Sequence, residues 1–304
     1  MSNDFDDIYI YGEVLFDCFE NAENKLGGAP FNVAWNLKGF GLNPKIITSI
    51  GEDSLGQDVL KTMKKWDLDT SCVNIIGDKK TGSVSIKVDD KGIPKYDIEN
   101  DRAYDYIDLP ANINNNSLVY HGSLALRNRY NQEQCKSLKE KIDSNTFIDI
   151  NLRDPWWSDK ILKDSLKNFR WLKLNDEEIP LVCKAFGKSI EDESEQIDFI
   201  FESLDFEVLI LTKGSQGAIL TDKDRNSIEM PVVKVDDMVD TVGAGDAFSS
   251  VVIYGIYNNW DKKTILNRAM KFASKVCGLN GAITDDKNFY GDFLKKWNKE
   301  SSSS

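Results

Sequence analysis

The sequence predicts an α/β protein, a three-layer α/β/α sandwich with a mainly parallel central sheet and a small β-sheet lid. Two observations carry this prediction. Short runs rich in β-branched and aromatic residues alternate with helical patterns, which is typical of βαβ units with helices on both faces of a sheet. One region shows the strict alternation of a β-hairpin instead. The buried strands are expected at residues 45–50, 118–121, 146–150, 171–174 and 207–212.

The lid is expected to comprise about residues 13–25 and 81–105. Its hairpin lies at residues 81–98, where apolar and polar side chains alternate on both sides of a polar turn. We expect the two segments to form a flap of antiparallel strands. An exposed flap with one apolar face often pairs with a second copy, which favours a homodimer through the lid. A further hairpin is predicted at residues 217–231.

Residues 1–298 of the 304 are expected to form one domain, followed by a polar tail at 299–304 that cannot bury surface and should be disordered. The net charge of −12 argues against nucleic acid or an anionic membrane as a partner. The five cysteines show no CxxC spacing, and residues 1–10 carry no targeting pattern. These features favour a small-molecule role in a reducing, cytoplasmic location.

The segment at residues 240–248 carries the strongest functional signal, because two glycines lead directly into Asp246 and a buried helix. N–H groups at a helix start lack partners, so Gly243, Ala244 and Gly245 are expected to form an anion hole for a phosphate. A carboxylate there would repel the phosphate unless it takes a proton from an attacking hydroxyl. Asp246 is therefore the candidate general base, and the alternative is that it only caps the helix.

A second pair of glycines, Gly27 and Gly28, precedes another helical run and has no acid after it. This pattern suits a sugar better than a phosphate. Asn32 adds a side chain that can both donate to and accept from a polyol. Asp17 could accept from two adjacent hydroxyls. The alternative is that the glycines only make a tight turn.

Polar residues follow the predicted strands, where ligands of open α/β sheets bind. Asn175 and Glu178 lie at a helix start and could organise waters around Mg²⁺, whereas Glu178 could instead be a capping residue. Thr212, Gly214 and Gly217 would bring a backbone turn to the phosphates or ribose of a nucleotide.

Arg153 lies two residues past Asn151 on the same face of a strand end, and it could meet a phosphate or an anionic substrate. Arg102 is interpreted as a surface ion pair, and Arg127 as a further candidate toward an anionic acceptor. His121, the only histidine, is expected to be structural, because phosphoryl transfer needs no second base.

In order and spacing these motifs resemble those of the ribokinase, or PfkB, family of carbohydrate kinases over residues 8–284. Residues 12–17, 26–30 and 149–153 most resemble the fructokinase-like branch. The resemblance implies a ribokinase-like fold, ATP and Mg²⁺ as cosubstrates, and transfer of the γ-phosphoryl group to a primary hydroxyl of a monosaccharide, fructose in this branch. The alternatives are another acceptor (ribose, 2-keto-3-deoxygluconate, a sugar phosphate or a nucleoside) and a sugar-binding regulator without catalysis.

The resemblance also implies roles for single residues. Asp246 matches the catalytic base, Glu178 would hold Mg²⁺ through water, and Asp240 falls where many members bind a monovalent cation, which suggests K⁺. The implied substrate-binding residues are Asp17, Gly27, Gly28, Asn32, Asn151 and Arg153. The implied nucleotide-binding residues are Asn175, Glu178, Thr212, Gly214, Gly217, Gly243 and Gly245.

Overall fold

The computed structural model describes residues 5–19, 23–88, 94–232 and 240–301. A nine-stranded sheet runs through the centre in the order β13-β12-β11-β10-β9-β8-β1-β4-β5, and it is parallel from β11 to β5. The strands of this sheet are β1 (Asp7–Tyr11), β4 (Lys45–Gly51), β5 (Val73–Ile76), β8 (Ser117–His121), β9 (Thr146–Asp149), β10 (Trp171–Asn175), β11 (Val208–Thr212), β12 (Ala218–Asp222) and β13 (Ser227–Met230).

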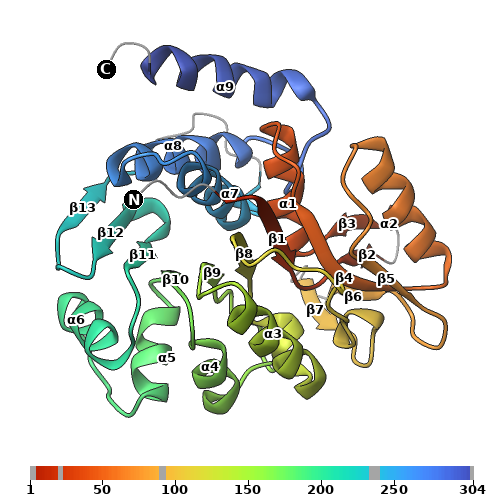
Figure 1. Ribbon diagram of the computed structural model, residues 1–304, viewed down its shortest axis with the longest axis horizontal. Helices are drawn as coiled ribbons and strands as arrows, with labels where there is room; N and C mark the ends of the chain where they lie inside the picture. Colours follow the sequence, from red (N-terminus) through yellow and green to blue (C-terminus); the bar gives the residue numbers. More distant parts are fainter. Residues whose placement is uncertain (1–4, 20–22, 89–93, 233–239, 302–304) are drawn as a thin grey trace.

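Helices cover both faces of this sheet, as Figure 1 shows, with α7 and α8 on one side and α3 to α6 on the other. The helices are α1 (Ala29–Gly39), α2 (Ser54–Lys65), α3 (Arg129–Lys141), α4 (Asp159–Ser165), α5 (Glu178–Ala185), α6 (Glu193–Ser203), α7 (Ala244–Tyr257), α8 (Lys262–Val276) and α9 (Lys287–Ser301). Three short 3₁₀ helices are η1 (Ala103–Asp105), η2 (Leu124–Arg127) and η3 (Gly214–Gln216). The predicted three-layer α/β sandwich is therefore confirmed. No described helix is both long and apolar enough to cross a membrane.

All five predicted strands are present, as β4, β8, β9, β10 and β11, and the hairpin predicted at 217–231 is β12 with β13. Two described strands of this sheet were not predicted, the edge strand β5 and β1, which lies between β8 and β4 as the third strand from the β5 edge. Two tyrosines and an aspartate break its apolar pattern, yet Tyr9 and Tyr11 are both buried. Packing on both faces, rather than local sequence, determines this strand.

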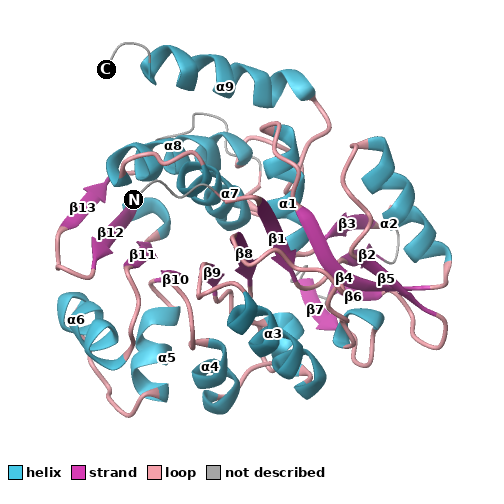
Figure 2. Ribbon diagram, in the orientation of Figure 1, coloured by secondary structure: helices cyan, strands magenta, loops and turns pink. Residues whose placement is uncertain are grey.

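The lid is a separate four-stranded sheet, β3-β2-β6-β7, formed by β2 (Leu15–Phe19), β3 (Lys25–Gly27), β6 (Gly82–Val88) and β7 (Pro94–Ile98). Figure 2 shows its strands at one end of the molecule, near β4 and β5. Its inner side chains, among them Leu15, Val84 and Ile86, share a core with Tyr11 and Ile47 of the large sheet. A small sheet packed at the edge of the larger one confirms the predicted lid.

The expectation of an entirely antiparallel flap is wrong. The pairs β2–β3 and β6–β7 are antiparallel, but β2 and β6 are parallel, with Leu15 opposite Gly82 and Phe19 opposite Ile86. The chain reaches β2 directly after β1 and β6 soon after β5, and both of those strands belong to the parallel sheet. Two strands that leave the same sheet edge in the same direction pair parallel to each other. The turn predicted at residues 89–92 lies outside the described residues.

The prediction placed the start of the disordered tail at residue 299, which is too early. Residues 299–301 instead form the last turn of α9. Arg268 of α8 donates to the carbonyl of Trp297 at 3.0 Å and pairs with the carboxylate of Glu300 at 3.1 Å. These contacts fasten the end of α9 to the domain. Residues 302–304 lie outside the described residues.

Candidate functional site

The amino end of α7 meets the carboxyl ends of the central strands. Ser249, in the second turn of this helix, donates its hydroxyl to Asp149, the last residue of β9, at 2.7 Å. Asp149 in turn accepts from Lys173 of β10. Several strand ends and one helix N-terminus therefore face a common region, as the motif positions predicted.

Gly243 forms the start of α7 in a conformation that only glycine adopts easily. Its φ is +78°, and a Cβ on it would lie 2.3 Å from the Cβ of Ala282. Among the described residues, no side chain caps the helix. Ala244 donates its N–H to the Thr241 carbonyl at 3.2 Å, whereas no described residue accepts from the N–H groups of Gly245 and Asp246. The N–H of Gly243 likewise has no described acceptor, so of the three predicted N–H groups only that of Ala244 is engaged, and the N–H of Asp246 adds to the groups open to an anion.

Asp246 is half-buried, and its Oδ2 accepts a 2.7 Å hydrogen bond from Nδ2 of Asn32. This contact joins the two glycine-rich motifs, which are far apart in the sequence. Burial raises the pKa of Asp246 to about 6, although the hydrogen bond from Asn32 opposes the shift. The carboxylate does not cap α7, because the N-cap residue is Gly243. A carboxylate with this pKa is ionised at neutral pH and is a stronger base than an ordinary aspartate.

Gly28 lies beside this pair at the start of α1, with a φ of +105°. A Cβ on it would lie 2.8 Å from the carbonyl oxygen of Glu13, so the tight-turn interpretation holds at this position. Gly27, the last residue of β3, pairs with Leu15. Asp17 lies further along β2, half-buried, and burial raises its pKa. Among the described residues, Asp17 makes no hydrogen bond to the Asn32–Asp246 pair.

Glu13 is a residue of this region that the sequence did not single out. It lies two residues after the end of β1, it is buried, and its Oε2 has no hydrogen-bond partner among the described residues. Burial raises the pKa of the Glu13 carboxyl to about 7, and the charge of Asp246 adds to that shift. In the sequence, the signal that could have identified Glu13 was an acidic residue close after a strand. The burial of this residue, however, depends on the lid and α1.

A buried ion pair lies beneath the start of α7. Lys173 Nζ lies 2.8 Å from both carboxylate oxygens of Asp149, and both side chains are buried. A Cβ placed on Gly245 would be 3.7 Å from the same Nζ. A cation therefore lies under the proposed anion hole. Lys173 could have been identified in the sequence, because it is a lysine inside the otherwise apolar run Trp171–Leu174 of a predicted buried strand.

Asn175 and Glu178 cap each other, which confirms the capping interpretation. The Asn175 side chain accepts from the N–H of Glu178 at 2.8 Å, and Glu178 Oε2 accepts from the N–H of Asn175 at 2.9 Å. Glu178 Oε1 also accepts from the N–H of Leu152 at 2.8 Å. Both oxygens of Glu178 already accept a backbone hydrogen bond, which is compatible with the predicted contact to Mg²⁺ through water. The described residues contain no group of three or more acidic, histidine or cysteine side chains that could hold a metal directly.

The loop after β11 lies next to this turn, since Thr212 pairs with Asn175 across the strands. Gly217 has a φ of +100°, and a Cβ there would be 2.1 Å from the Met230 carbonyl, so the hairpin itself requires glycine. Gly214 also has a positive φ, of +49°. The ammonium of Lys213 pairs with Glu193 and Glu229. The loop therefore offers backbone groups rather than a lysine to a nucleotide.

Asn151 and Arg153 follow β9. Asn151 adopts a φ of +47°, and Arg153 is exposed. The positive charge of Arg153 is among the smaller contributions to the pKa of Asp246, which places its guanidinium near the site. The side chain of Asp240 accepts a hydrogen bond from the N–H of Val242 at 3.0 Å. The backbone N–H of Asp240 donates to the carbonyl of Cys277, the residue that follows α8.

Arg102, Arg127 and His121 each have partners in the structure. Arg102 forms an ion pair with Glu99, and Arg127 binds both oxygens of Asp105. His121 is buried and lies 2.9 Å from the Gly122 carbonyl. Burial, and then the charge of a neighbouring lysine, lower its pKa to about 3. His121 therefore stays neutral and structural, as predicted.

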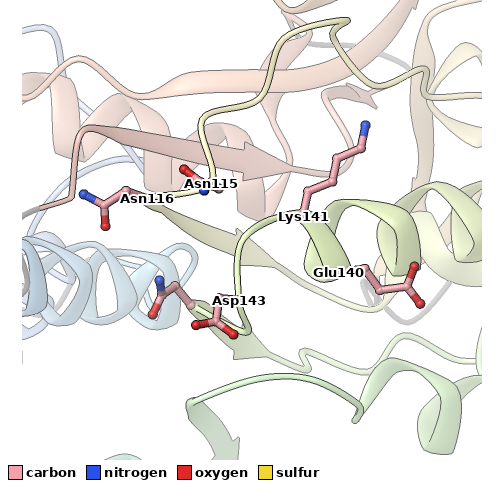
Figure 3. A pocket seen from close by; sticks show the side chains of 6 residues that line it. Asn115, Asn116, Glu140, Lys141 and Asp143 are labelled. Atoms are coloured by element: carbon pink, nitrogen blue, oxygen red, sulfur yellow. The ribbon is translucent and has the colours of Figure 1, made fainter.

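A polar depression lies away from these residues (Figure 3). It is lined by Asn115, Asn116, Glu140, Lys141, Asp143 and Asn145. Asn116 and Asn145 directly precede β8 and β9, so the depression lies at the amino ends of these strands. Ligands of parallel sheets bind at the opposite edge, and the depression is not the candidate active site.

Comparison with known proteins agrees with this geometry. The model of the pfkB family of carbohydrate kinases matches residues 7–288. A protein described as a sugar kinase from Pyrococcus horikoshii is 27% identical over 294 residues, covering 88% of each chain, and its crystal structure matches with a TM-score of 0.75 over 94% of this chain and 99% of that one. A second structure of that protein is in complex with ATP.

Two further relatives act on different acceptors according to their names. The ATP-dependent 6-phosphofructokinase of Thermoanaerobacterium thermosaccharolyticum is 26% identical, covering 89% of this chain and 84% of the relative. The fructokinase of Salmonella typhimurium is also 26% identical, covering 83% and 85%. With a family match over almost its whole length, this chain belongs to the PfkB family of carbohydrate kinases.

Proposed function

We propose that this sugar kinase transfers the γ-phosphoryl group of ATP to a primary hydroxyl of fructose, with Asp246 as the general base. The observation that supports this most is the hydrogen bond from Asn32 to Asp246 at the open end of α7. It brings an amide suited to a sugar, a carboxylate suited to proton transfer and two N–H groups suited to a phosphate into one place. The fructokinase-like motifs and the Salmonella relative support fructose as the acceptor.

In this mechanism Asp246 takes the proton of the attacking hydroxyl, while Asn32 holds the carboxylate in position. The N–H groups of Gly245 and Asp246 face the negative charge that develops on the transferred group, and the positive end of α7 adds to this stabilisation. Bound ATP would supply the phosphoryl group, and Mg²⁺ held through water by Glu178 would offset its charge. The backbone of the loop at residues 212–217 would contact the nucleotide.

The test is an assay of ADP release with Mg²⁺ and ATP, with and without K⁺. The acceptors are fructose, ribose, mannose, glucose, 2-keto-3-deoxygluconate, fructose phosphates, adenosine and inosine. Turnover with fructose alone supports the proposal. Turnover with another acceptor instead would support the proposed mechanism but identify a different substrate. Turnover that depends on K⁺ would support a role of Asp240 in binding a monovalent cation. Sugar binding without turnover would favour a regulator. A homodimer through the lid is a separate prediction, which the mass of the protein in solution tests.

The pH profile provides a further prediction. Only the ionised form of Asp246 can accept a proton, and its pKa is about 6. We expect kcat/KM to fall about tenfold for each pH unit below 6 and to reach a plateau above about pH 7. The profile is measured with the coupling enzymes in excess at every pH. A rate that stays constant down to pH 5 would show that the base does not have a pKa near 6, because an aspartate with an ordinary pKa would still be ionised there.

A further inference from the structure

Glu13 lies among an unusual number of buried polar atoms that have no hydrogen-bond partner in the described part of the chain. These atoms are Glu13 Oε2, Asn32 Oδ1, the hydroxyls of Tyr104 and Tyr120, and Arg127 Nη1. All five side chains are at least nine-tenths buried. Most buried polar atoms in folded proteins are hydrogen-bonded, so five such atoms together call for a ligand.

These groups line one region beside the candidate base. A Cβ on Gly28 would lie 3.5 Å from Glu13 Cγ, and Gly28 begins the helix that carries Asn32. The Arg127 guanidinium lies 4.9 Å from the centre of the Tyr104 ring. Burial raises the pKa of Tyr104 and of Tyr120, and the charge of Glu13 adds to both shifts. Burial opposes the raised pKa of Arg127, which arises from the hydrogen bonds to Asp105 and to a smaller extent from the charges of neighbours that include Glu13. The unpartnered atoms are therefore neighbours of one another.

The charges of this region favour a neutral ligand. Arg127 is neutralised by both oxygens of Asp105, and Arg102 by Glu99. The carboxyl groups of Glu13 and Asp246 remain, and the exposed Arg153 is close enough for its charge to lower the pKa of both. An anionic acceptor would meet two carboxylates and one exposed cation, whereas hydroxyl groups can donate to the carboxylates and accept from Tyr104, Tyr120 and Arg127.

We propose that Glu13 determines acceptor specificity, with Oε2 accepting a hydrogen bond from a hydroxyl other than the one that is phosphorylated. Tyr104, Tyr120 and Arg127 Nη1 supply the donors around it. The acceptor is then a neutral, polyhydroxylated sugar rather than a phosphorylated or carboxylated one. This inference rests on the proposed function, since it assigns the sugar pocket of the same reaction.

The experiment compares the wild type with Glu13→Met, which keeps the length of the side chain and removes its acceptors. The substrates are the best neutral sugar of the acceptor panel and its deoxy analogues, each without one hydroxyl. In the wild type, one deoxy analogue should show a KM raised about 10- to 100-fold. In E13M the parent sugar should show a similar rise, the KM for ATP should stay within about twofold, and discrimination against that analogue should disappear.

Two further variants make the result interpretable. Glu140→Gln, at the opposite edge of the sheet, should leave all KM values unchanged. Glu13→Gln replaces E13M if the latter does not fold, as judged by its thermal melting curve, and should reduce the same discrimination. A merely structural role of Glu13 would not remove the preference for one particular hydroxyl.

The outcomes separate this inference from the proposed function. Wild-type turnover of a neutral sugar with an unchanged KM and unchanged discrimination in E13M would overturn the role of Glu13 and leave the kinase activity standing. A clear preference of the wild type for a phosphorylated acceptor would also overturn it. If the wild type turns over no acceptor, calorimetric Kd values for the same sugars replace the KM values. Absence of both turnover and binding would reject both proposals.

Discussion

Replacing Asp246 with Asn should lower kcat for the best acceptor about 10²- to 10⁴-fold, the usual contribution of a general base. Asn keeps the shape of the side chain and can still accept the hydrogen bond from Asn32. It cannot take a proton, so the loss should appear in kcat rather than in the KM for sugar. The measurement is steady-state kinetics of ADP release. Full activity in D246N would eliminate Asp246 as the base.

Two controls distinguish this loss from damage to the fold. Asp159→Asn changes an exposed aspartate in the first turn of α4 and should leave kcat unchanged. The stability of D246N provides the second control. The folded-state pKa of Asp246 is raised from 3.8 to about 6, so the stabilising effect of its protonated form is present below about pH 4 and lost as the pH rises through 6. At pH 8, D246N should therefore be more stable than the wild type, by about 1 kcal/mol after allowance for partial exposure.

The sequence predicted those parts of the site that depend on local backbone chemistry. Gly243 before Asp246 marks an open helix start, because a positive φ and an uncapped helix both follow from the residue types. The contact between Asn32 and Asp246 follows once both helices are known to start at the same sheet edge. For such residues, motif and topology are sufficient.

Residues whose role depends on burial could not be found in this way. Glu13 looks like any acid after a strand until the lid and α1 cover it and leave Oε2 without a partner. From the sequence alone, Glu178 is compatible with both a helix cap and a metal site. Only the structure shows that its carboxylate also accepts a hydrogen bond from the N–H of Leu152 and so fixes the loop after β9. The parallel pairing of β2 with β6 depends on where the chain leaves the large sheet, which periodicity does not reveal.

The second large effect concerns the ion pair beneath α7. Asp149→Ala would leave the ammonium of Lys173 buried without its carboxylate, and the Ser249 hydroxyl would lose its acceptor. Breaking one side of a buried ion pair usually costs about 3–5 kcal/mol. We expect the free energy of unfolding of D149A, measured in urea at pH 7.5, to fall by about that amount. Glu133→Ala, which removes an exposed partner of Arg129, should cost less than about 0.5 kcal/mol.

A double variant, Asp149→Leu with Lys173→Met, tests whether this cost comes from the unpaired charge. Replacing both partners with apolar side chains of similar size is often neutral, so most of the stability lost in D149A should return. If it does not, the cost arises from packing or from the Ser249 hydroxyl instead. Activity then answers a different question. Lys173 Nζ lies under Gly245, so a double variant with restored stability but an increased KM for ATP would show that its positive charge contributes to phosphate binding at the start of α7.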